Sequence, residues 1–314
     1  MAVTRLTAPP RSLSFVDQTA LSETLAVERT EVVLILGDRY ELLDVVLVAT
    51  VQGCAIAHCC GGERTAGAFD NQVRDAVTKM AHLHYPAHQL AADRLGVLQE
   101  EQWRICVSGE PGLDSLLTER RLDSNELRGL LGVEPGPHDI MVAVHPVTHH
   151  PQETRALLEC VRTVASHWEG RVFLSSPNGD PGSEAIVDAW RDLAGRDGRR
   201  IFLPSLGSLA FRSLVARCGA LVGNSSAGLV EAPSLGTPSV DVGARQEGRL
   251  RGSSVISCPE VTPEAVGAAV EAALRMKQAP TWSAGPNPYG DGRSAPRILD
   301  HLVAHARRPD LRAK

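Results

Sequence analysis

The sequence has no long apolar run and no excess of positive charge. Over 314 residues the formal net charge is −5, so the overall charge gives no reason to expect nucleic acid or an anionic membrane as a partner. The most apolar stretch, 42–60, is interrupted by Asp44 and Gln52-Gly53, and it falls short of the roughly 20 apolar residues of a membrane-spanning helix. The N-terminus also lacks the apolar core of a secretory signal. We therefore expect a cytoplasmic protein.

The cysteines do not form the pattern of a disulfide framework. There are seven of them, at irregular spacings, and most lie in or beside apolar runs, as Cys54, Cys106 and Cys218 do. An odd number in a chain of this size favours reduced thiols that are buried as small apolar side chains.

One cluster of potential metal ligands also lacks the required spacing. His58, Cys59 and Cys60, with His82 and His84, show neither the two-residue gap of a structural zinc site nor the helical spacing of a catalytic one. We expect no metal ion and no cofactor.

Segments typical of strands alternate with segments typical of helices along most of the chain. This repeat predicts an α/β fold with parallel sheets, in which ligand sites lie at the carboxyl ends of the strands. Strands are expected at 32–36, 54–58, 104–107, 140–144, 172–174, 201–203, 220–222 and 239–242, and helices at 15–26, 40–51, 71–83, 87–95, 152–168, 183–193, 209–217, 229–235, 263–277 and 295–307.

A Gly- and Pro-rich break at 132–137 interrupts the repeat and follows a charged region. We expect a domain boundary there. Residues 1–132 would form an N-terminal Rossmann-like domain on the sugar and catalytic side. Residues 138–314 would form a C-terminal, nucleotide-binding Rossmann-like domain with a returning C-terminal helix, and a cleft would separate the two domains.

The run from Gly223 to Gly228 is the strongest candidate for a ligand site. It follows an apolar strand and precedes a short helix, and its small residues let the backbone approach a ligand. The unpaired N–H groups of a first helical turn and the hydroxyls of Ser225 and Ser226 would suit a diphosphate, and Glu231 could accept both hydroxyls of a ribose. The alternative is an ordinary Gly/Ser loop in which one serine caps the helix.

This run, with Glu231-Ala232-Pro233 and the segment 243–249, resembles the C-terminal signature of the hydrolysing UDP-N-acetylglucosamine 2-epimerases. The resemblance covers about residues 30–276 and implies the GT-B fold of two Rossmann-like domains. It also implies a reaction in which UDP is eliminated from a UDP-sugar and the intermediate is hydrated to the free 2-epimer. The further matching segments are 37–39 with Glu41, 58–63, 67–70, Arg74, 79–84, 109–114 and 145–148.

The family reaction needs a carboxylate base near C2, a grip on the leaving diphosphate and an acid/base pair for hydration. Carried over by position, the resemblance implies Asp38 and Asp70 as acid/base carboxylates and His145 as the residue that faces the phosphates. The remaining implied residues are Glu63 and Cys60 as further catalytic candidates, Asn224, Ser225, Ser226, Gly228, Glu231 and Arg245 as nucleotide or diphosphate ligands, and Arg39, His58 and Arg74 as substrate contacts.

Each of these residues has a structural role as its alternative. Aspartate is a favoured helix N-cap, and charged side chains often pair or face solvent. In that case Asp38 and Asp70 cap the helices that follow them, His145 ends a strand and is satisfied by backbone, Glu63 and Arg74 form a structural ion pair, and Arg245 and Arg249 are surface charge.

Two features depart from the family pattern. Cys60 stands where family members carry Glu or His, and a thiol is a poor general base unless its pKa falls well below the usual ~8.5. The family also begins with a strand, a phosphate-contacting loop and a further crossover, so roughly two βαβ units of ~30 residues each have no counterpart in this sequence. We therefore expect a shortened N-terminal domain with an exposed sheet edge, which a homodimer could cover.

The sequence thus predicts an enzyme whose partner is a nucleotide-sugar substrate, with no nucleic acid and no membrane. The first alternative is a nucleotide-sugar or nucleoside hydrolase of altered substrate range. The second is a non-catalytic subunit that binds a nucleotide sugar. A glycosyltransferase of the same fold is less favoured because the matching motifs are those of the epimerases.

Overall fold

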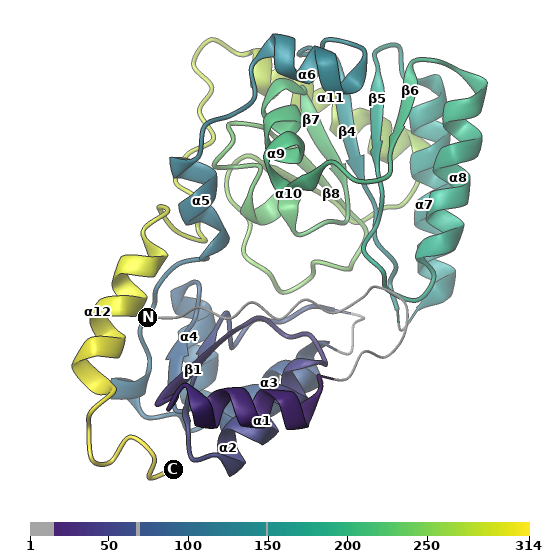
Figure 1. Cartoon of the computed structure of the whole chain (residues 1–314). Coiled ribbons are helices and arrows are strands. Elements are labelled where there is room, and N and C mark those ends of the chain that lie inside the picture. The colour runs from purple at the N-terminus through teal and green to yellow at the C-terminus, as the bar shows by residue number, and fades with distance from the viewer. Residues whose placement is uncertain (1–15, 67–69, 149) are drawn as a thin grey trace. The chain divides into compact units, whose positions relative to one another are not determined.

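The computed structural model describes residues 16–66, 70–148 and 150–314 (Figure 1). The chain divides into two compact units. The first comprises the described residues of 1–63, 69–111 and 293–314, and the second those of 64–68 and 112–292.

This division lies upstream of the expected boundary at 132–137. Residues that follow Pro111 belong to the second unit because they bond to its helix α9 (Gly207–Arg217): Arg212 donates to the Gly112 carbonyl, at 3.2 Å, and to Ser115 Oγ, at 2.9 Å. The last helix, in turn, belongs to the first unit.

The first unit is a three-stranded parallel sheet, in the order β1-β2-β3, with helices on both faces. Alternate residues of the central strand separate the two cores: Ile56 packs with α1, α2 and α3, whereas Ala55 and Ala57 pack with α12 and the residues after it. The elements are α1 (Gln18–Val27), β1 (Val32–Leu36), α2 (Leu42–Val51), β2 (Ala55–Cys59), α3 (Asp70–Met80), β3 (Leu83–Tyr85), α4 (Gln89–Val97), the 3-10 helix η1 (Gln102–Arg104) and α12 (Ser294–His305).

The second unit contains a six-stranded parallel sheet in the order β6-β5-β4-β7-β8-β9. Its main core lies between the sheet and helices α7, α8 and α11, around the fully buried Trp190, and α9 and α10 lie in front of the strands in Figure 1. The strand order reverses between β4 and β7, which is where α/β proteins bind ligands. The other elements are α5 (Gly112–Thr118), α6 (Ser124–Leu131), β4 (Ile140–Ala143), α7 (Pro151–His167), β5 (Val172–Ser175), α8 (Ser183–Arg196), β6 (Arg200–Leu203), β7 (Ala220–Gly223), α10 (Ala227–Val230), β8 (Ser239–Val242), β9 (Val255–Cys258) and α11 (Pro263–Gln278).

Most expected elements are present, but the strand predicted at 104–107 is wrong. Gln102–Arg104 is a 3-10 helix, and only Ile105 makes a bridge, to His84 of β3. Strands β3 and β9 and helices α5 and α6 were not expected from the sequence. Helix α6 carries a complete capping box, in which Asp123 and Glu126 bond to each other's backbone N–H groups, and that signal was readable in the charged region.

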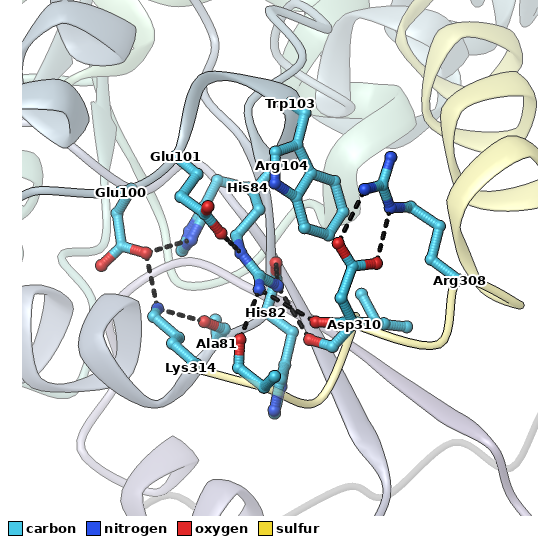
Figure 2. Close-up of polar contacts among 12 residues, drawn as sticks. Ala81, His82, His84, Glu100, Glu101, Trp103, Arg104, Arg308, Asp310 and Lys314 are labelled. Carbon is cyan, nitrogen blue, oxygen red and sulfur yellow. Dashed lines mark hydrogen bonds and ion pairs between the residues drawn. The ribbon is translucent and has the colours of Figure 1, made fainter.

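The buried guanidinium of Arg104 binds the C-terminal residues to the rest of the first unit (Figure 2). It donates to the carbonyls of Leu311 and Ala313, both at 2.8 Å, and to those of His82 and Asp310, both at 3.2 Å. One cation thus satisfies four carbonyl groups from two distant parts of the chain.

The fully buried carboxylate of Glu100 completes this anchor. Its oxygens lie 2.9 Å from Lys79 Nζ, 2.9 Å from His84 Nε2 and 2.6 Å from Lys314 Nζ. Burial alone would raise the pKa of Glu100, but hydrogen bonds from His84, Lys314 and Lys79 outweigh it and hold the pKa at about 2. The carboxylate is therefore charged near neutral pH.

Among the described ranges, none of the helices combines the length and apolarity that crossing a bilayer requires.

We expect Arg104→Met to destabilise the first unit by about 3 kcal/mol or more, because the substitution leaves buried carbonyl groups without a donor. Chemical denaturation monitored by circular dichroism measures this loss. The matched control is Arg120→Met, which removes an exposed arginine paired with Glu126 at 2.8 Å and should cost far less stability, because solvent screens that pair. Equal effects of the two substitutions would contradict the anchoring role of Arg104.

Candidate functional site

The candidate carboxylate Asp38 follows β1 and is held by a buried arginine. Its Oδ2 accepts a hydrogen bond from Arg74 of α3, whose side chain is 1% exposed, while 29% of the Asp38 side chain stays accessible. The alternative that Asp38 caps the next helix is wrong, because the N-cap of α2 is Glu41. Asp38 is therefore an ion-paired, oriented carboxylate that a ligand can reach.

The described contacts of Arg74 are not the alternative ion pair with the Glu63 carboxylate. Its Nη1 donates instead to the backbone carbonyl of Glu63, at 2.8 Å, and to Asn71 Oδ1, at 3.0 Å. The guanidinium is too buried for the substrate contact that we expected of it, and its role is to fix Asp38 and the chain at Glu63 in the same unit.

The Glu63 carboxylate is buried and faces α4. The side chain is 5% exposed, and its Oε1 lies 2.7 Å from Nε2 of His88. Asp70, the third candidate carboxylate, occupies the first turn of α3. Residues 67–69 of the matching segment 67–70 lie outside the described residues.

His58 does not fit the substrate contact expected of it, whereas Arg39 is accessible enough to make one. His58 is fully buried, with Nε2 2.8 Å from the Gly37 carbonyl and Nδ1 3.2 Å from Thr78 Oγ1, so it supports the backbone before Asp38 rather than a ligand. Burial lowers the pKa of His58 to about 4, which keeps the ring neutral. Arg39 is 64% exposed and pairs with Glu41 at 2.7 Å.

Cys60 is a protonated thiol in this environment. Its backbone is left-handed, with φ 63°, and its Sγ donates to Glu110 Oε2 at 3.2 Å. Burial, followed by the charge of Glu110, raises the pKa of the thiol well above its usual value. Cys60 therefore cannot serve as a thiolate base near neutral pH, and the carboxylate beside it is Glu110.

In the second unit Asn224 joins the ends of β4 and β7. Its Oδ1 accepts from the His145 N–H at 2.7 Å, and its Nδ2 donates to the His145 carbonyl at 2.8 Å. Both ends of a fully buried amide are thereby used on backbone, so Asn224 holds the strand ends together instead of offering the diphosphate contact that we expected.

The packing around Asn224 explains why the run 223–228 is made of small residues. Gly223 has φ 140°, and a Cβ there would lie 2.1 Å from the Ala143 carbonyl oxygen, so only glycine fits between the strands. Gly228 packs α10 on β8, where its carbonyl accepts from Ser239 Oγ at 2.6 Å. Ser225 and Ser226 remain partly exposed at the start of α10, where Ser226 is the N-cap without a side-chain bond.

Arg245 lies against the same strand ends. It donates to the Pro146 carbonyl at 3.3 Å and to the Asn224 carbonyl at 3.2 Å, and the buried Gln246 donates to the latter at 2.8 Å. The alternative of a solvated surface charge therefore does not describe Arg245, which places its cation beside β7.

His145 is held at the end of β4 by Asn178 of the loop after β5. Asn178 approaches the ring Nδ1 with its Oδ1, at 3.2 Å, and its backbone N–H, at 3.3 Å. Burial, and then the charge of Arg245, lowers the pKa of His145 to about 4, so the ring is neutral and acts as a hydrogen-bonding group near pH 7.

A cavity of about 370 Å³ opens at the carboxyl ends of β5 and β6, within the second unit. Glu231 lines it, with 25% of its side chain exposed and Oε1 3.3 Å from the Arg212 guanidinium. Helix α10 ends at Val230, so Glu231 follows that helix instead of lying within the expected helix at 229–235. Other lining residues are Ser175, Ser176, Asn178, Ser205, Ser208, Phe211 and Arg212.

Several side chains that contact the candidate site residues were not expected from the sequence. His88, Gln246 and Arg212 were not singled out, and Asn178 lies in a loop with no motif. Glu110 and Gln246 stood within matching segments. The described residues contain no group of three or more histidine, cysteine, aspartate or glutamate side chains that could hold a metal ion.

Comparison with protein families and curated proteins gives a consistent result. The family model described as UDP-N-acetylglucosamine 2-epimerase matches residues 18–303. A protein of Campylobacter jejuni named GDP/UDP-N,N'-diacetylbacillosamine 2-epimerase (hydrolyzing) is 30% identical over 78% of this chain and 64% of its own length. A Legionella pneumophila protein named UDP-N,N'-diacetylbacillosamine 2-epimerase (hydrolyzing) is 30% identical over 90% of this chain and 73% of its own. This chain thus spans about two thirds of the length of these relatives.

Solved structures show the same fold. The UDP-GlcNAc 2-epimerase of Neisseria meningitidis bound to UDP-GlcNAc matches 92% of this chain and 80% of its own, with a TM-score of 0.76 and 15% identity. That of Methanocaldococcus jannaschii in complex with UDP-GlcNAc and UDP matches 91% and 79%, with a TM-score of 0.73 and 19% identity. The expected α/β fold of GT-B type is confirmed.

We expect Asn224→Asp to destabilise the second unit by about 3 kcal/mol, because a carboxylate oxygen would replace the Nδ2 donor and face the His145 carbonyl. Thermal unfolding followed by calorimetry checks this. Asn125→Asp makes the same chemical change at an exposed site in the first turn of α6 and should be neutral within about 0.5 kcal/mol. If Asn224→Asp were equally neutral, the amide would not be joining the two strands.

Proposed function

The chain belongs to the UDP-N-acetylglucosamine 2-epimerase family, and on that premise we propose that it is a hydrolysing nucleotide-sugar 2-epimerase. The substrate is UDP-N-acetylglucosamine or a related 2-acetamido UDP-sugar, and the products are UDP and the free 2-epimer. The names of the two relatives extend the range of candidates to 2,4-diacetamido sugars.

The observation that carries this proposal is the pairing of Asp38 with the buried Arg74. A base at C2 has to be ionised, oriented and accessible, and Asp38 combines a fixed Oδ2 with 29% exposure. Asp38 removes the C2 proton, UDP leaves from C1, and water then adds across the resulting double bond. Glu63 and Asp70 are the carboxylates that handle the protons of the hydration step.

The second unit binds the nucleotide in this proposal. The cavity of about 370 Å³ accepts the nucleoside, with the carboxylate of Glu231 at the ribose hydroxyls. Ser225, Ser226, the neutral His145 and the cation of Arg245 hold the diphosphate, which develops charge as it leaves. Gly228 and Asn224 act by shaping this part of the backbone.

The test is to incubate the protein with UDP-N-acetylglucosamine, its 2,4-diacetamido relatives and other nucleotide sugars, and to follow sugar and nucleotide by NMR. We expect UDP and the free 2-epimer, with deuterium at C2 when the reaction runs in D₂O. Asp38→Asn should lower kcat at least about 100-fold, because it removes the base while keeping the shape. Asp114→Asn, also on a carboxylate of a matching segment but in helix α5, is the control and should retain activity.

The other outcomes separate the alternatives. Release of UDP with the unchanged sugar indicates a nucleotide-sugar hydrolase. Binding of UDP without turnover of any nucleotide sugar contradicts the enzymatic proposal and favours a binding subunit. An Asp38→Asn variant as active as the wild type contradicts the assignment of the base.

We further propose that the protein is a homodimer in which a second copy covers the edge of β1. Support comes from the described strands, in which β1 lies at one edge of its sheet and exposes Leu34 and Leu36, each by 56%. Analytical ultracentrifugation should give a dimer, and Leu34→Lys should shift it to a monomer. Val97→Lys, at an apolar residue that is 83% exposed on α4, should leave the dimer unchanged. A monomeric wild-type protein would contradict this part of the proposal.

A further inference from the structure

The segment that carries Glu63 is held in place by α4, the helix after β3. Gly62 has φ 79°, and a Cβ at this residue would lie 2.3 Å from the Ala91 carbonyl oxygen, so the chain passes directly over the first turn of α4. From the same helix Arg94 donates to the Gly62 carbonyl at 3.3 Å. Glu63 therefore reaches its position in close contact with a rigid element.

His88 is the N-cap of α4 and makes the contact with the Glu63 side chain. Its Nδ1 accepts a hydrogen bond from the Ala91 N–H at 3.1 Å, which is the usual task of a serine or aspartate at this position. An imidazole whose Nδ1 accepts a hydrogen bond carries its single proton on Nε2. Helix capping therefore fixes the tautomer of the ring.

The protonated nitrogen is the atom that faces the carboxylate. Nε2 lies 2.7 Å from Oε1 of Glu63, and the exposed fractions of the two side chains are only 4% and 5%. At this separation, and in such a dry environment, a ring that is fixed by its own helix restrains the position of the carboxylate.

We propose that His88 is a positioning residue for Glu63, and that its ring, which the helix cap holds in place, keeps this carboxylate aligned through the contact at Nε2. The inference rests on the proposed function, in which Glu63 handles a proton. His88 acts only through Glu63 and touches no substrate.

Contacts that do not involve His88 are also made around Glu63. Arg74 of α3 binds its backbone carbonyl, Arg94 of α4 binds the preceding carbonyl, and the thiol of Cys60 is directed to Glu110. A change at His88 therefore alters the immediate surroundings of the carboxylate while these contacts stay in place.

The first measurement does not depend on turnover. Long-range ¹H–¹⁵N NMR of histidine-labelled wild-type protein, with His88 assigned by its loss in His88→Ser, should show the ring proton on Nε2, since Nδ1 accepts from the Ala91 N–H. A ring protonated on Nδ1 would overturn the proposal.

The second measurement is kinetic. His88→Ser keeps a cap for α4 but removes the donor to Glu63. We expect kcat to fall about tenfold with KM changed less than twofold, and the acid limb of the kcat–pH profile to move to higher pH, since the carboxylate is easier to protonate. His88→Asn, which also caps and keeps more volume, should show the same loss. In a Glu63→Gln background His88→Ser should have less than a twofold effect.

Asp17→Ser is the matched control, because Asp17 caps α1 of the same unit through an equivalent bond to Ala20 N–H, at 3.0 Å. It should change neither kcat nor the pH profile. An inactive wild-type protein contradicts the proposed function, whereas an active one whose kcat and acid limb are unchanged in both His88 variants contradicts only the role of His88. A variant that loses thermal stability and activity without a shift of the acid limb indicates a purely structural histidine.

Discussion

The buried guanidinium of Arg74 is the contact on which the first unit's candidate site depends. A fully desolvated arginine is stable only when its donors are matched, and here they are taken by Asp38, Asn71 and the Glu63 carbonyl. These partners come from the end of β1, from α3 and from the loop after β2. Burial of one cation therefore fixes the spacing of two carboxylate-bearing segments that follow the paired strands β1 and β2.

The second unit solves the same problem with a neutral group. Asn224 offers one donor and one acceptor to the backbone of His145, at the point where the strand order reverses. Under the proposed function, a charge there would repel or attract the phosphates of the nucleotide, whereas an amide leaves that task to Arg245. The protein thus places fixed charge where a base must be oriented, and an uncharged clamp where an anion is expected.

Much of the fold could be predicted because parallel strands that are buried on both faces appear in the sequence as short apolar runs. β1 and β8 were placed to the residue. The failures have two different causes. Helix α6 is indicated by a capping box rather than by apolar periodicity, and at Arg104 a long-range contact with the C-terminal residues replaced the expected strand. The motifs predicted which segments carry site residues. They could not predict that the side chains of His58, Arg74 and Asn224 are buried and hold other groups in place, since burial depends on packing between distant segments.

The discontinuity of the first unit constrains the order in which the protein is made and folds. The core on the α12 side of its sheet includes Ile298 and Leu311, and Arg104 donates to carbonyl groups of residues beyond 309. Neither is complete until those residues have been synthesised. The second unit, apart from residues 64–68, is one continuous segment that ends at Gly292. During synthesis it can therefore complete its sheet while the first three strands are still without their last helix. The nascent first unit is then the part most exposed to aggregation, and it is where folding assistance would have its largest effect.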